Sequence, residues 1–304
     1  MSVFDQEQML RVCEELGIEV IEGNVSMMND KPVRVEDKIF KNDKVTIFNG
    51  VEMPRMVYEE LFNKEYVDRK GKIISFEGTD GCFKETNSKR LYEYLKDLGI
   101  KVNLVSFPRY DDDSSIFIKR YLNGEYDSEY NNKVGIVPTA YMYALDRYDY
   151  IVRNKVRERV EEGEWFIFDR YVESNVIYES ARIIYNNKIS ARSLEVSHGV
   201  FDDILNFEYI QLALPKPDIL IALFSDYDLT MELLSKRETT DKNESDKEFM
   251  MYVFATYDIL INVYNWNRIN VFEYIEEKEK YQFKSKDQIF NEILDLLRDR
   301  KILL

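Results

Sequence analysis

The sequence contains few of the residues that build several common kinds of site. Its 304 residues include two cysteines, Cys13 and Cys82, which lie far apart and form no C-x-x-C pair. This spacing excludes a zinc knuckle and a disulfide framework, and it favours a reducing cytoplasm. His198 is the only histidine. A Ser-His-Asp or Cys-His mechanism would therefore depend on His198, which we expect to be a surface or helix residue instead.

Positive charge and long apolar runs are also scarce. The 42 Lys and Arg residues against 57 Asp and Glu residues give a net charge of −15. A surface this acidic repels the phosphate backbone, so we expect no nucleic-acid partner. No uncharged run reaches the roughly 18–20 residues of a membrane helix, and acidic residues stand where a signal peptide would be basic. We therefore expect a cytoplasmic protein with no membrane partner.

Apolar content is sufficient for a large folded core, with 45% hydrophobic and 14% aromatic residues. From residue 72 onward, compact apolar runs alternate with longer amphipathic stretches, which is typical of parallel strands joined by crossover helices. The runs are nearly continuous, as expected for strands that are covered on both faces. The five predicted strands are Lys72–Gly78, Lys101–Pro108, Trp165–Arg170, Pro217–Phe224 and Ile269–Ile275.

Helical spacing fills the gaps between these strands. After the first strand, Leu91, Tyr94, Leu95 and Leu98 share one helical face, and Gly99 follows as a candidate C-terminal cap. Near the end of the chain a capping box is predicted at Ser285 and Gln288. The last amphipathic helix presents Ile289, Phe290, Ile293, Leu294 and Leu297.

Residues 1–70 read as a separate N-terminal extension of α+β type, distinct from the domain over residues 71–304. Apolar residues between Met9 and Leu16 indicate a short helix that ends before Gly17. Short strands are expected at Ile18–Ile21, Val33–Val35 and Val45–Phe48. No chemistry is visible in this extension, which is interpreted as a packing or oligomerisation element or, alternatively, as a binding module.

The first strand of the main domain leads into G-T-D-G-C-F-K-E-T at residues 78–86, which aligns with the P-loop pattern G-x-x-x-x-G-K-[ST]. A strand, a tight loop with Gly78 and Gly81 and a helix opening at Lys84 would direct backbone N–H groups at a phosphate. The Lys84 ammonium would reach the transferred group. The alternative interpretation of these residues is an ordinary strand-loop-helix turn.

Two positions of this loop depart from the pattern. Phe83 stands where glycine is usual, and a positive φ there would cost about 1–2 kcal/mol. Glu85 replaces the hydroxyl residue that meets Mg²⁺, and its carboxylate could bind the ion or repel the triphosphate. Thr86 is the alternative hydroxyl. The predicted ATP-binding residues are Gly78, Gly81, Cys82, Phe83, Lys84, Glu85 and Thr86.

Other segments between residues 72 and 304 resemble one family, the thymidylate kinases, in the right order along the chain. The loop F-E-G-T-D-G at residues 76–81 is similar to that family's loop, which implies that Asp80 holds the 3′-hydroxyl of the nucleotide. F-P-R-Y at residues 107–110 resembles a motif of the family in which the arginine, here Arg109 after Phe107, grips the monophosphate. A guanidinium fork suits a phosphate at the carboxyl end of a strand.

A second pair of residues points to recognition of a base. Tyr143 and Arg147 lie four residues apart, on one face of a helix. The resemblance implies that Tyr143 stacks on thymine and that Arg147 hydrogen-bonds a base carbonyl. The alternative is a core tyrosine beside a surface arginine.

The stretch D-R-Y-V-E-S-N-V-I-Y at residues 169–178 is the most specific one, since it resembles the family's D-R-Y-x-x-S-N-x-x-Y. Asp169 ends an apolar strand, where a carboxylate can organise Mg²⁺, and Arg170 can bridge donor and acceptor phosphates. The resemblance implies that Asn175 reads the thymine edge and that Tyr178 crowds the sugar 2′ position. L-P-K-P-D at residues 214–218 also resembles the family.

In that family a mobile lid carries arginines that close over ATP, and residues 235–246 occupy the corresponding place. Arg237 is the candidate for charge stabilisation in the transition state, because the loop at residues 78–86 has no arginine. A solvated polar loop is the alternative interpretation.

The sequence is thus identified as a thymidylate kinase-like member of the P-loop kinases: an α/β fold with a five-stranded parallel sheet flanked by helices. The resemblance implies Mg²⁺-dependent, in-line transfer of the ATP γ-phosphate to dTMP, giving dTDP for dTTP synthesis. Candidate catalytic residues are Lys84, Asp169, Arg170 and Arg237, and Asp169 and Glu85 are candidate metal ligands.

Two alternatives to this function remain. One is a kinase for another deoxynucleotide or deoxynucleoside. The other is a regulatory or scaffold protein that binds nucleotide with a disabled ATP site. Homodimers are common in the family, but nothing in the sequence identifies an interface.

Overall fold

A computed structural model describes residues 18–21, 24–28, 32–33, 45–48, 51–54, 69–126, 136–188, 203–236, 246–276 and 280–303. The chain divides into two compact units. The larger unit comprises Arg69–Glu208 and Leu214–Leu304, and the smaller comprises Met1–Asp68 and Tyr209–Ala213.

The larger unit is built around a five-stranded sheet in which every neighbouring pair is parallel. Its order is β10-β9-β6-β8-β7, so the strand that leads into the glycine-containing loop lies at the centre. This confirms the predicted five-stranded parallel sheet. The strands are β10 (Asn267–Asn270), β9 (Ile219–Phe224), β6 (Ile73–Gly78), β8 (Trp165–Asp169) and β7 (Val102–Ser106).

The predicted fifth strand, Ile269–Ile275, is wrong as one element, because it divides at Val271. Residues before Val271 belong to β10, and residues after it form β11 (Phe272–Ile275), which pairs antiparallel with β12 (Lys280–Phe283). The Val271 N–H donates to the Phe224 carbonyl at 2.9 Å, at the last residue of β9. Since β9 ends there, the chain leaves the sheet and pairs with β12 instead.

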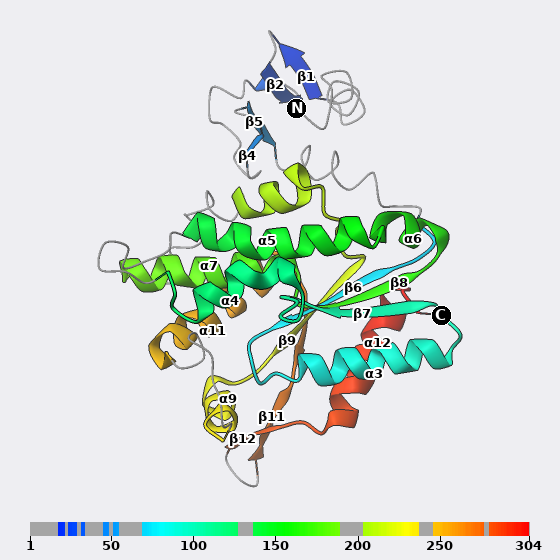
Figure 1. Ribbon diagram of the computed structural model, residues 1–304, viewed down its shortest axis with the longest axis vertical. Helices are drawn as coiled ribbons and strands as arrows, with labels where there is room; N and C mark the ends of the chain where they lie inside the picture. The colour runs from blue at the N-terminus through cyan, green and yellow to red at the C-terminus, as the bar shows by residue number, and fades with distance from the viewer. Residues whose placement is uncertain are drawn as a thin grey trace. The chain divides into compact units, whose positions relative to one another are not determined.

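Helices cover both faces of this sheet (Figure 1). Helices α3 and α12 pack on one face, and α5, α7 and α11 form a layer on the other. The helices are α3 (Lys84–Asp97), α4 (Ile116–Leu122), α5 (Ile136–Arg153), α6 (Val156–Glu162), α7 (Val172–Asn187), α9 (Tyr227–Leu234), α11 (Lys247–Val263) and α12 (Lys286–Asp299), with a 3₁₀ turn at Asp113–Ser115 and a π-helical segment at Asn206–Gln211.

The last helix forms as its sequence predicts. The Ser285 hydroxyl accepts from the Gln288 N–H at 3.2 Å, and the Gln288 side chain accepts from the Ser285 N–H at 2.8 Å, which completes the capping box. All five predicted apolar residues of α12 are buried. Their cluster also holds residues of α3 and of the facing side of the sheet, so this face carries one continuous core.

Helix α3 places Leu91 and Leu95 in the same core, as predicted, and Gly99 follows the helix with a φ of 79°. Leu98 differs from the prediction. The helix ends at Asp97, and Leu98 is the cap residue with 56% of its surface exposed. The turn of the chain toward β7 thus removes Leu98 from the apolar face.

Five short strands are described in the smaller unit. β1 (Ile18–Ile21), β2 (Asn24–Met28) and β3 (Pro32–Val33) form an antiparallel sheet, and β4 (Val45–Phe48) pairs with β5 (Val51–Pro54). Strands at Ile18–Ile21 and Val45–Phe48 were predicted, whereas β2 and β5 were not. The helix expected between Met9 and Leu16 lies outside the described residues, and so does His198.

Among the described helices, none combines the length and the apolar character that crossing a membrane requires.

Candidate active site

The loop between β6 and α3 closes tightly on neighbouring backbone. Gly78 has a φ of 146°, and a Cβ atom at this position would lie 2.3 Å from the Leu223 carbonyl oxygen and 2.5 Å from the Cys82 sulfur. Only glycine fits there. The Cys82 thiol is buried and donates to the Thr79 carbonyl at 2.9 Å, and burial raises its pKa. Cys82 is therefore a packing residue of the loop rather than a nucleophile.

Phe83 occupies a left-handed conformation, with a φ of 63° and a ψ of 26°. The loop thus keeps a glycine-type backbone at this position in spite of the larger residue, at a cost of about 1–2 kcal/mol. The Phe83 ring packs edge-on against Phe283 of β12, with centroids 5.0 Å apart. This contact holds the ring between the loop and the hairpin and offsets part of the strain.

Lys84, the first residue of α3, has its ammonium group folded back onto the loop. Its Nζ donates to the Thr79 carbonyl at 2.6 Å and lies 4.0 Å from the Asp80 carboxylate. The residue is 6% exposed. A cation is therefore positioned at the helix N-terminus, where backbone N–H groups also favour an anion.

The side chain of Glu85 contacts a neighbouring residue of α3. Its carboxylate forms an exposed ion pair with Lys89 at 2.5 Å, one turn along α3. The side chain is 74% exposed, although the residue also lines the pocket beside the loop, as does Thr86. Within the described part of the chain, no group of three or more His, Cys, Asp or Glu residues is arranged to hold a metal ion.

Asp169 is the last residue of β8 and is 6% exposed. Burial raises the pKa of its carboxyl, while the nearby charges of Lys84 and Arg170 act in the opposite direction. Parallel pairing places Asp169 beside Phe76 of β6 and Ser106 of β7, at the carboxyl ends of the central strands. This is the edge at which ligands bind in α/β sheets.

Arg170 follows at once and joins the loop to α7. It has a φ of 67°, its N–H donates to the Phe76 carbonyl at 2.9 Å, and its guanidinium forms a close ion pair with Asp80. The hydroxyl of Tyr178 donates to the other Asp80 oxygen at 3.1 Å. Burial opposes the charge of Arg170, but Asp80 raises its pKa well above the ordinary value. Asp80 thus holds Arg170 and Tyr178 in one cluster.

Two pockets meet at this cluster. The first, of about 480 Å³, contains the loop residues and is lined by Asp80, Gly81, Phe83, Lys84, Glu85, Thr86, Ser106, Asp169, Arg170, Leu233 and Lys236. The second, of about 270 Å³, is lined by Asp80, Ser106, Phe107, Pro108, Tyr110, Tyr143, Arg147, Arg170, Ser174, Asn175, Tyr178, Glu179 and Arg182. We call them the loop pocket and the α7 pocket. Asp80, Ser106 and Arg170 line both.

Most residues predicted to bind the nucleotide line the α7 pocket. These are Asp80, Phe107, Tyr143, Arg147, Arg170, Asn175 and Tyr178. Arg147 is 2% exposed. This burial contradicts the alternative interpretation, in which Arg147 is a surface arginine beside a core tyrosine.

Arg237 lies outside the described residues. Its neighbour Lys236 lines the loop pocket, and its ammonium pairs with Glu232 at 2.8 Å.

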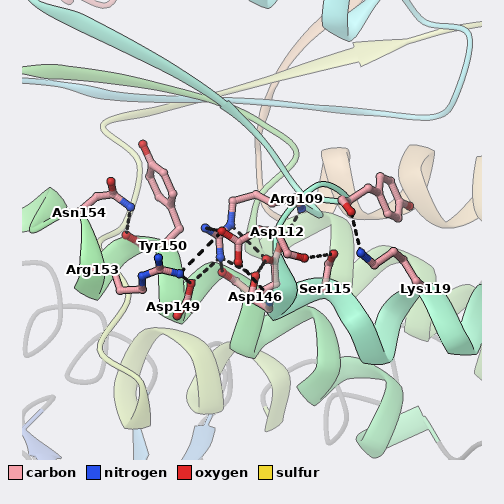
Figure 2. A network of polar contacts seen from close by, with 11 residues as sticks. Arg109, Asp112, Ser115, Lys119, Asp146, Asp149, Tyr150, Arg153 and Asn154 are labelled. Carbon is pink, nitrogen blue, oxygen red and sulfur yellow. Dashed lines mark hydrogen bonds and ion pairs between the residues drawn. The ribbon is translucent and has the colours of Figure 1, made fainter.

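Arg109 is not among the described residues that line either pocket. Figure 2 shows its guanidinium among the carboxylates of Asp112, Asp146 and Asp149. The Arg109–Asp146 contact measures 3.1 Å and the Arg109–Asp149 contact 2.8 Å. Asp146 is fully buried and also accepts from the Ser114 hydroxyl at 2.5 Å. In this conformation Arg109 neutralises an acidic cluster at the end of β7.

Sequence reasoning missed Glu208. Its two carboxylate oxygens accept from Arg147 at 2.6 Å each, and Oε1 also accepts from the Asn175 amide at 2.7 Å. Glu208 lies in the π-helical segment at Asn206–Gln211, far along the chain from α5 and α7. No local pattern marks it, since the contact exists only once these elements are packed together.

Glu77 was also missed, although the sequence carries a signal for it. It is the one charged residue of the buried strand β6, and it is itself fully buried. Its carboxylate accepts from the Tyr171 N–H at 2.7 Å and from the Ser174 hydroxyl. Burial raises the pKa of Glu77, and these hydrogen bonds lower it again. Glu77 therefore anchors the start of α7 beneath the pocket.

Comparison with known proteins agrees with this geometry. Residues 76–191 match the family model described as thymidylate kinase. This region begins in β6 and runs through the loop, β7, β8 and α7. Residues 76–191 are thus similar to the thymidylate kinase family. This matched region contains all of the residues that line the α7 pocket.

Individual relatives are similar over part of the chain. The chain is 32% identical to a thymidylate kinase of Plasmodium falciparum over 118 residues, which is 39% of this chain and 52% of the relative. It is 31% identical to one of Thermoanaerobacter sp. over 136 residues, or 44% of this chain and 64% of the relative. The chain therefore spans between half and two thirds of the length of these curated relatives.

A solved thymidylate kinase structure from Candida albicans has a TM-score of 0.56 at 18% identity, covering 77% of this chain and 94% of that one. This likeness establishes the fold alone. The fold agrees with the five-stranded parallel sheet flanked by helices that the sequence predicts.

Proposed function

We propose that the protein transfers the γ-phosphate of ATP to dTMP, giving ADP and dTDP. The observation that carries the proposal is that Asp80 and Arg170 line both the loop pocket and the α7 pocket. A phosphoryl transfer needs its donor and acceptor phosphates to meet, and a guanidinium at the junction can bind both.

Each substrate has a pocket of suitable chemistry. The loop pocket offers Lys84 and the N-terminus of α3 to the ATP phosphates. The α7 pocket offers Tyr143 for stacking, and Arg147 and Asn175 for the base edge. The α7 pocket combines aromatic rings with several polar and charged side chains, which can fix the orientation of a small polar ligand.

The proposed reaction requires the protein mainly to position the two substrates and to neutralise the charge on the transferred group. In the proposed reaction an oxygen of the dTMP phosphate attacks the γ-phosphorus in line, the bond to the ADP oxygen breaks, and no covalent intermediate forms. Lys84 and Arg170 neutralise the charge that develops on the transferred group, and Asp80 fixes the direction of the Arg170 fork. Arg109 and Arg237 remain predictions for phosphate binding and for charge stabilisation by the lid.

The buried carboxylate of Asp169 fits Mg²⁺, because this ion is usually held by one or two carboxylates together with substrate phosphates. When bound, Mg²⁺ would neutralise charge on the ATP phosphates. Glu85 remains a predicted second ligand, and it would first have to leave its ion pair with Lys89. Asp169→Asn should raise the Mg²⁺ concentration needed for half-maximal activity more than Glu85→Gln does.

The test is an ADP-release assay with ATP, Mg²⁺ and each deoxynucleoside monophosphate in turn, beside a thermal-shift titration with dTMP alone. Turnover with dTMP supports the proposal. A rise in melting temperature without turnover would favour a nucleotide-binding regulatory protein with a disabled ATP site. This alternative arises because Phe83 and Glu85 depart from the P-loop pattern. Turnover with a different acceptor would favour a related kinase.

We propose a cytoplasmic role in dTTP synthesis with ATP and dTMP as the small-molecule partners. The homodimer stays a prediction, which the mass of the protein in solution would test.

A further inference from the structure

Three buried glutamates lie at or beneath the α7 pocket, and one of them differs from the other two. Glu208 is paired with Arg147, and Glu77 accepts hydrogen bonds from Tyr171 and Ser174. Glu179 lines the pocket and is 1% exposed, yet its Oε2 atom is buried with no hydrogen-bond partner among the described residues.

The positive charge nearest to Glu179 compensates the negative charge of its carboxylate only weakly. Arg182 lies one turn further along α7, with its Nε atom 3.6 Å from Glu179 Oε2, which is an ion-pair distance but too long for a good hydrogen bond. Burial raises the pKa of Glu179 to about 7, and Arg182 offsets only part of this shift. A buried carboxyl oxygen without a hydrogen bond is costly, so natural proteins usually supply a partner or a ligand.

The position of Glu179 in the pocket indicates which part of a nucleotide it would contact. It follows Asn175 by four residues, so the two side chains share one face of α7. Neither lines the loop pocket, whereas Asp80 and Arg170 line both and mark the phosphate end. Glu179 is thus in the part of the α7 pocket that the loop pocket does not share, on the same helix face as the candidate base-binding residue Asn175.

The other titratable groups around Glu179 are phenols and one guanidinium. Tyr143 of α5 lines the same pocket and interacts electrostatically with Glu179, Arg182, Tyr110 and Tyr121. Burial raises the pKa of Tyr143 well above its ordinary value, so this phenol stays neutral at physiological pH. From α11, the apolar ring of Phe249 packs under Arg182 at 4.9 Å. Among these groups, Glu179 is the one expected to change charge near neutral pH.

We propose that Glu179 is a specificity-determining residue, which hydrogen-bonds an exocyclic group of the acceptor's base and selects keto or amino bases according to its own protonation. The inference rests on the proposed function, because it assigns the base end of the same acceptor site.

The selection follows from hydrogen-bond chemistry. A protonated Glu179 donates through its O–H and therefore suits a keto oxygen, as in thymine or uracil. The carboxylate can only accept and therefore suits the amino group of cytosine. A mismatched pair leaves a buried polar group unpaired, which discriminates strongly between analogues. The preference for dTMP over dCMP should therefore decrease as the pH rises through 7.

The experiment measures the dissociation constants of dTMP and dCMP by calorimetry at several values between pH 6 and pH 8. The ratio of the two constants is the readout, because the phosphate titrates in both nucleotides and its contribution cancels. A group with a pKa of about 7 changes from about nine tenths protonated to about one tenth over this range. The deprotonated fraction rises about tenfold over the same range, so we expect the ratio of the two constants to change by up to about a hundredfold in the wild-type protein.

Glu179→Gln supplies the decisive comparison, because the amide has the same shape and does not titrate. Its ratio should be independent of pH. Glu173→Gln is the matched control, since Glu173 is a buried carboxyl of the same helix that does not line the pocket. This control should keep the wild-type dependence on pH. Thermal unfolding at each pH establishes that the variants are folded, and the wild-type ratio alone tests the proposal if Glu179→Gln does not fold.

A wild-type ratio that is constant with pH would overturn the inference while leaving the proposed function intact, provided that dTMP binds and is phosphorylated. A Glu179→Gln protein with the wild-type pH dependence would overturn it as well. If neither nucleotide binds at any pH, both the proposed function and the inference fail.

Discussion

Arg147 and Glu208 form a two-point ion pair, with two N–O distances of 2.6 Å, and neither side chain is appreciably exposed to solvent. Glu208 also accepts from the amide of Asn175, whose second N–H contact is the Ala140 carbonyl at 2.9 Å. These contacts direct both amide hydrogens away from the pocket. Glu208 thereby positions the two residues proposed to read the base.

Glu208→Gln should separate this positioning role from catalysis. The amide cannot match both Arg147 and Asn175 as an acceptor, so the KM for dTMP should rise about tenfold, whereas kcat should stay within about threefold. Removing one charge of a buried pair should also lower the free energy of unfolding by about 3 kcal/mol. Steady-state kinetics and denaturant unfolding measure the two effects.

The matched control for this variant is Glu248→Gln, because Glu248 pairs with Lys188 in an exposed ion pair. It should change the free energy of unfolding by less than about 1 kcal/mol. A Glu208→Gln protein with an unchanged KM would contradict the positioning role.

Arg170→Lys should abolish most of the transfer. Lysine keeps the charge but lacks the planar fork that reaches Asp80 and two phosphates together, so kcat should fall by about 10²–10³. Lys84→Ala should have a similar effect, whereas Arg147→Ala should mainly weaken dTMP binding. The control is Arg298→Lys, an exposed arginine of α12. A wild-type transfer rate in Arg170→Lys would remove the central assignment.

Phe83→Gly tests whether the unusual loop is functional as it stands. Glycine relieves about 1–2 kcal/mol of left-handed strain but loses the ring contact with Phe283, about 0.5–1.5 kcal/mol, and adds chain entropy to the unfolded state. The free energy of unfolding should therefore change by less than about 1 kcal/mol. Because the loop backbone already has the glycine conformation, the KM for ATP should change less than about tenfold; a large gain in activity would show that Phe83 disables the site.

Glu164 should make the larger unit sensitive to acid. Hydrogen bonds from Arg159, at 2.6 and 2.9 Å, together with contacts from Lys101 and Asn103, lower the pKa of Glu164 from 4.5 to about 2. The folded state then binds fewer protons than the unfolded state, so this stabilisation is complete above pH 4.5 and is lost as the pH falls toward 2.

Glu164→Gln should therefore be less stable than the wild-type protein at pH 7, and the difference should shrink as the pH falls from 4.5 to 2. Urea unfolding at a series of pH values measures it. A constant difference across this range would show that the ion pairs of Glu164 do not carry the effect.

The sequence was sufficient for features that depend on a few adjacent residues. The Ser285–Gln288 capping box was predicted, because both of its hydrogen bonds are local. At Phe83 the sequence indicated only the cost that a positive φ would carry, and the structure shows that the residue is left-handed. The division at Val271 could not be seen in the sequence, since apolar residues recur on both sides of it and the place where β9 stops determines the break.

The sequence by itself thus determined the order of strands and helices and the loop at residues 78–86, because periodicity and motif spacing are written along the chain. Most residues of the α7 pocket were indicated by the resemblance of short motifs to one family. Tertiary structure decided which charges are paired. It placed Arg109 among three aspartates, Arg147 on Glu208 and Glu179 against a weak partner. The Arg109–Asp146 and Arg147–Glu208 pairs join side chains 37 and 61 residues apart, and the burial of all three sites is set only when the layers of the fold pack together.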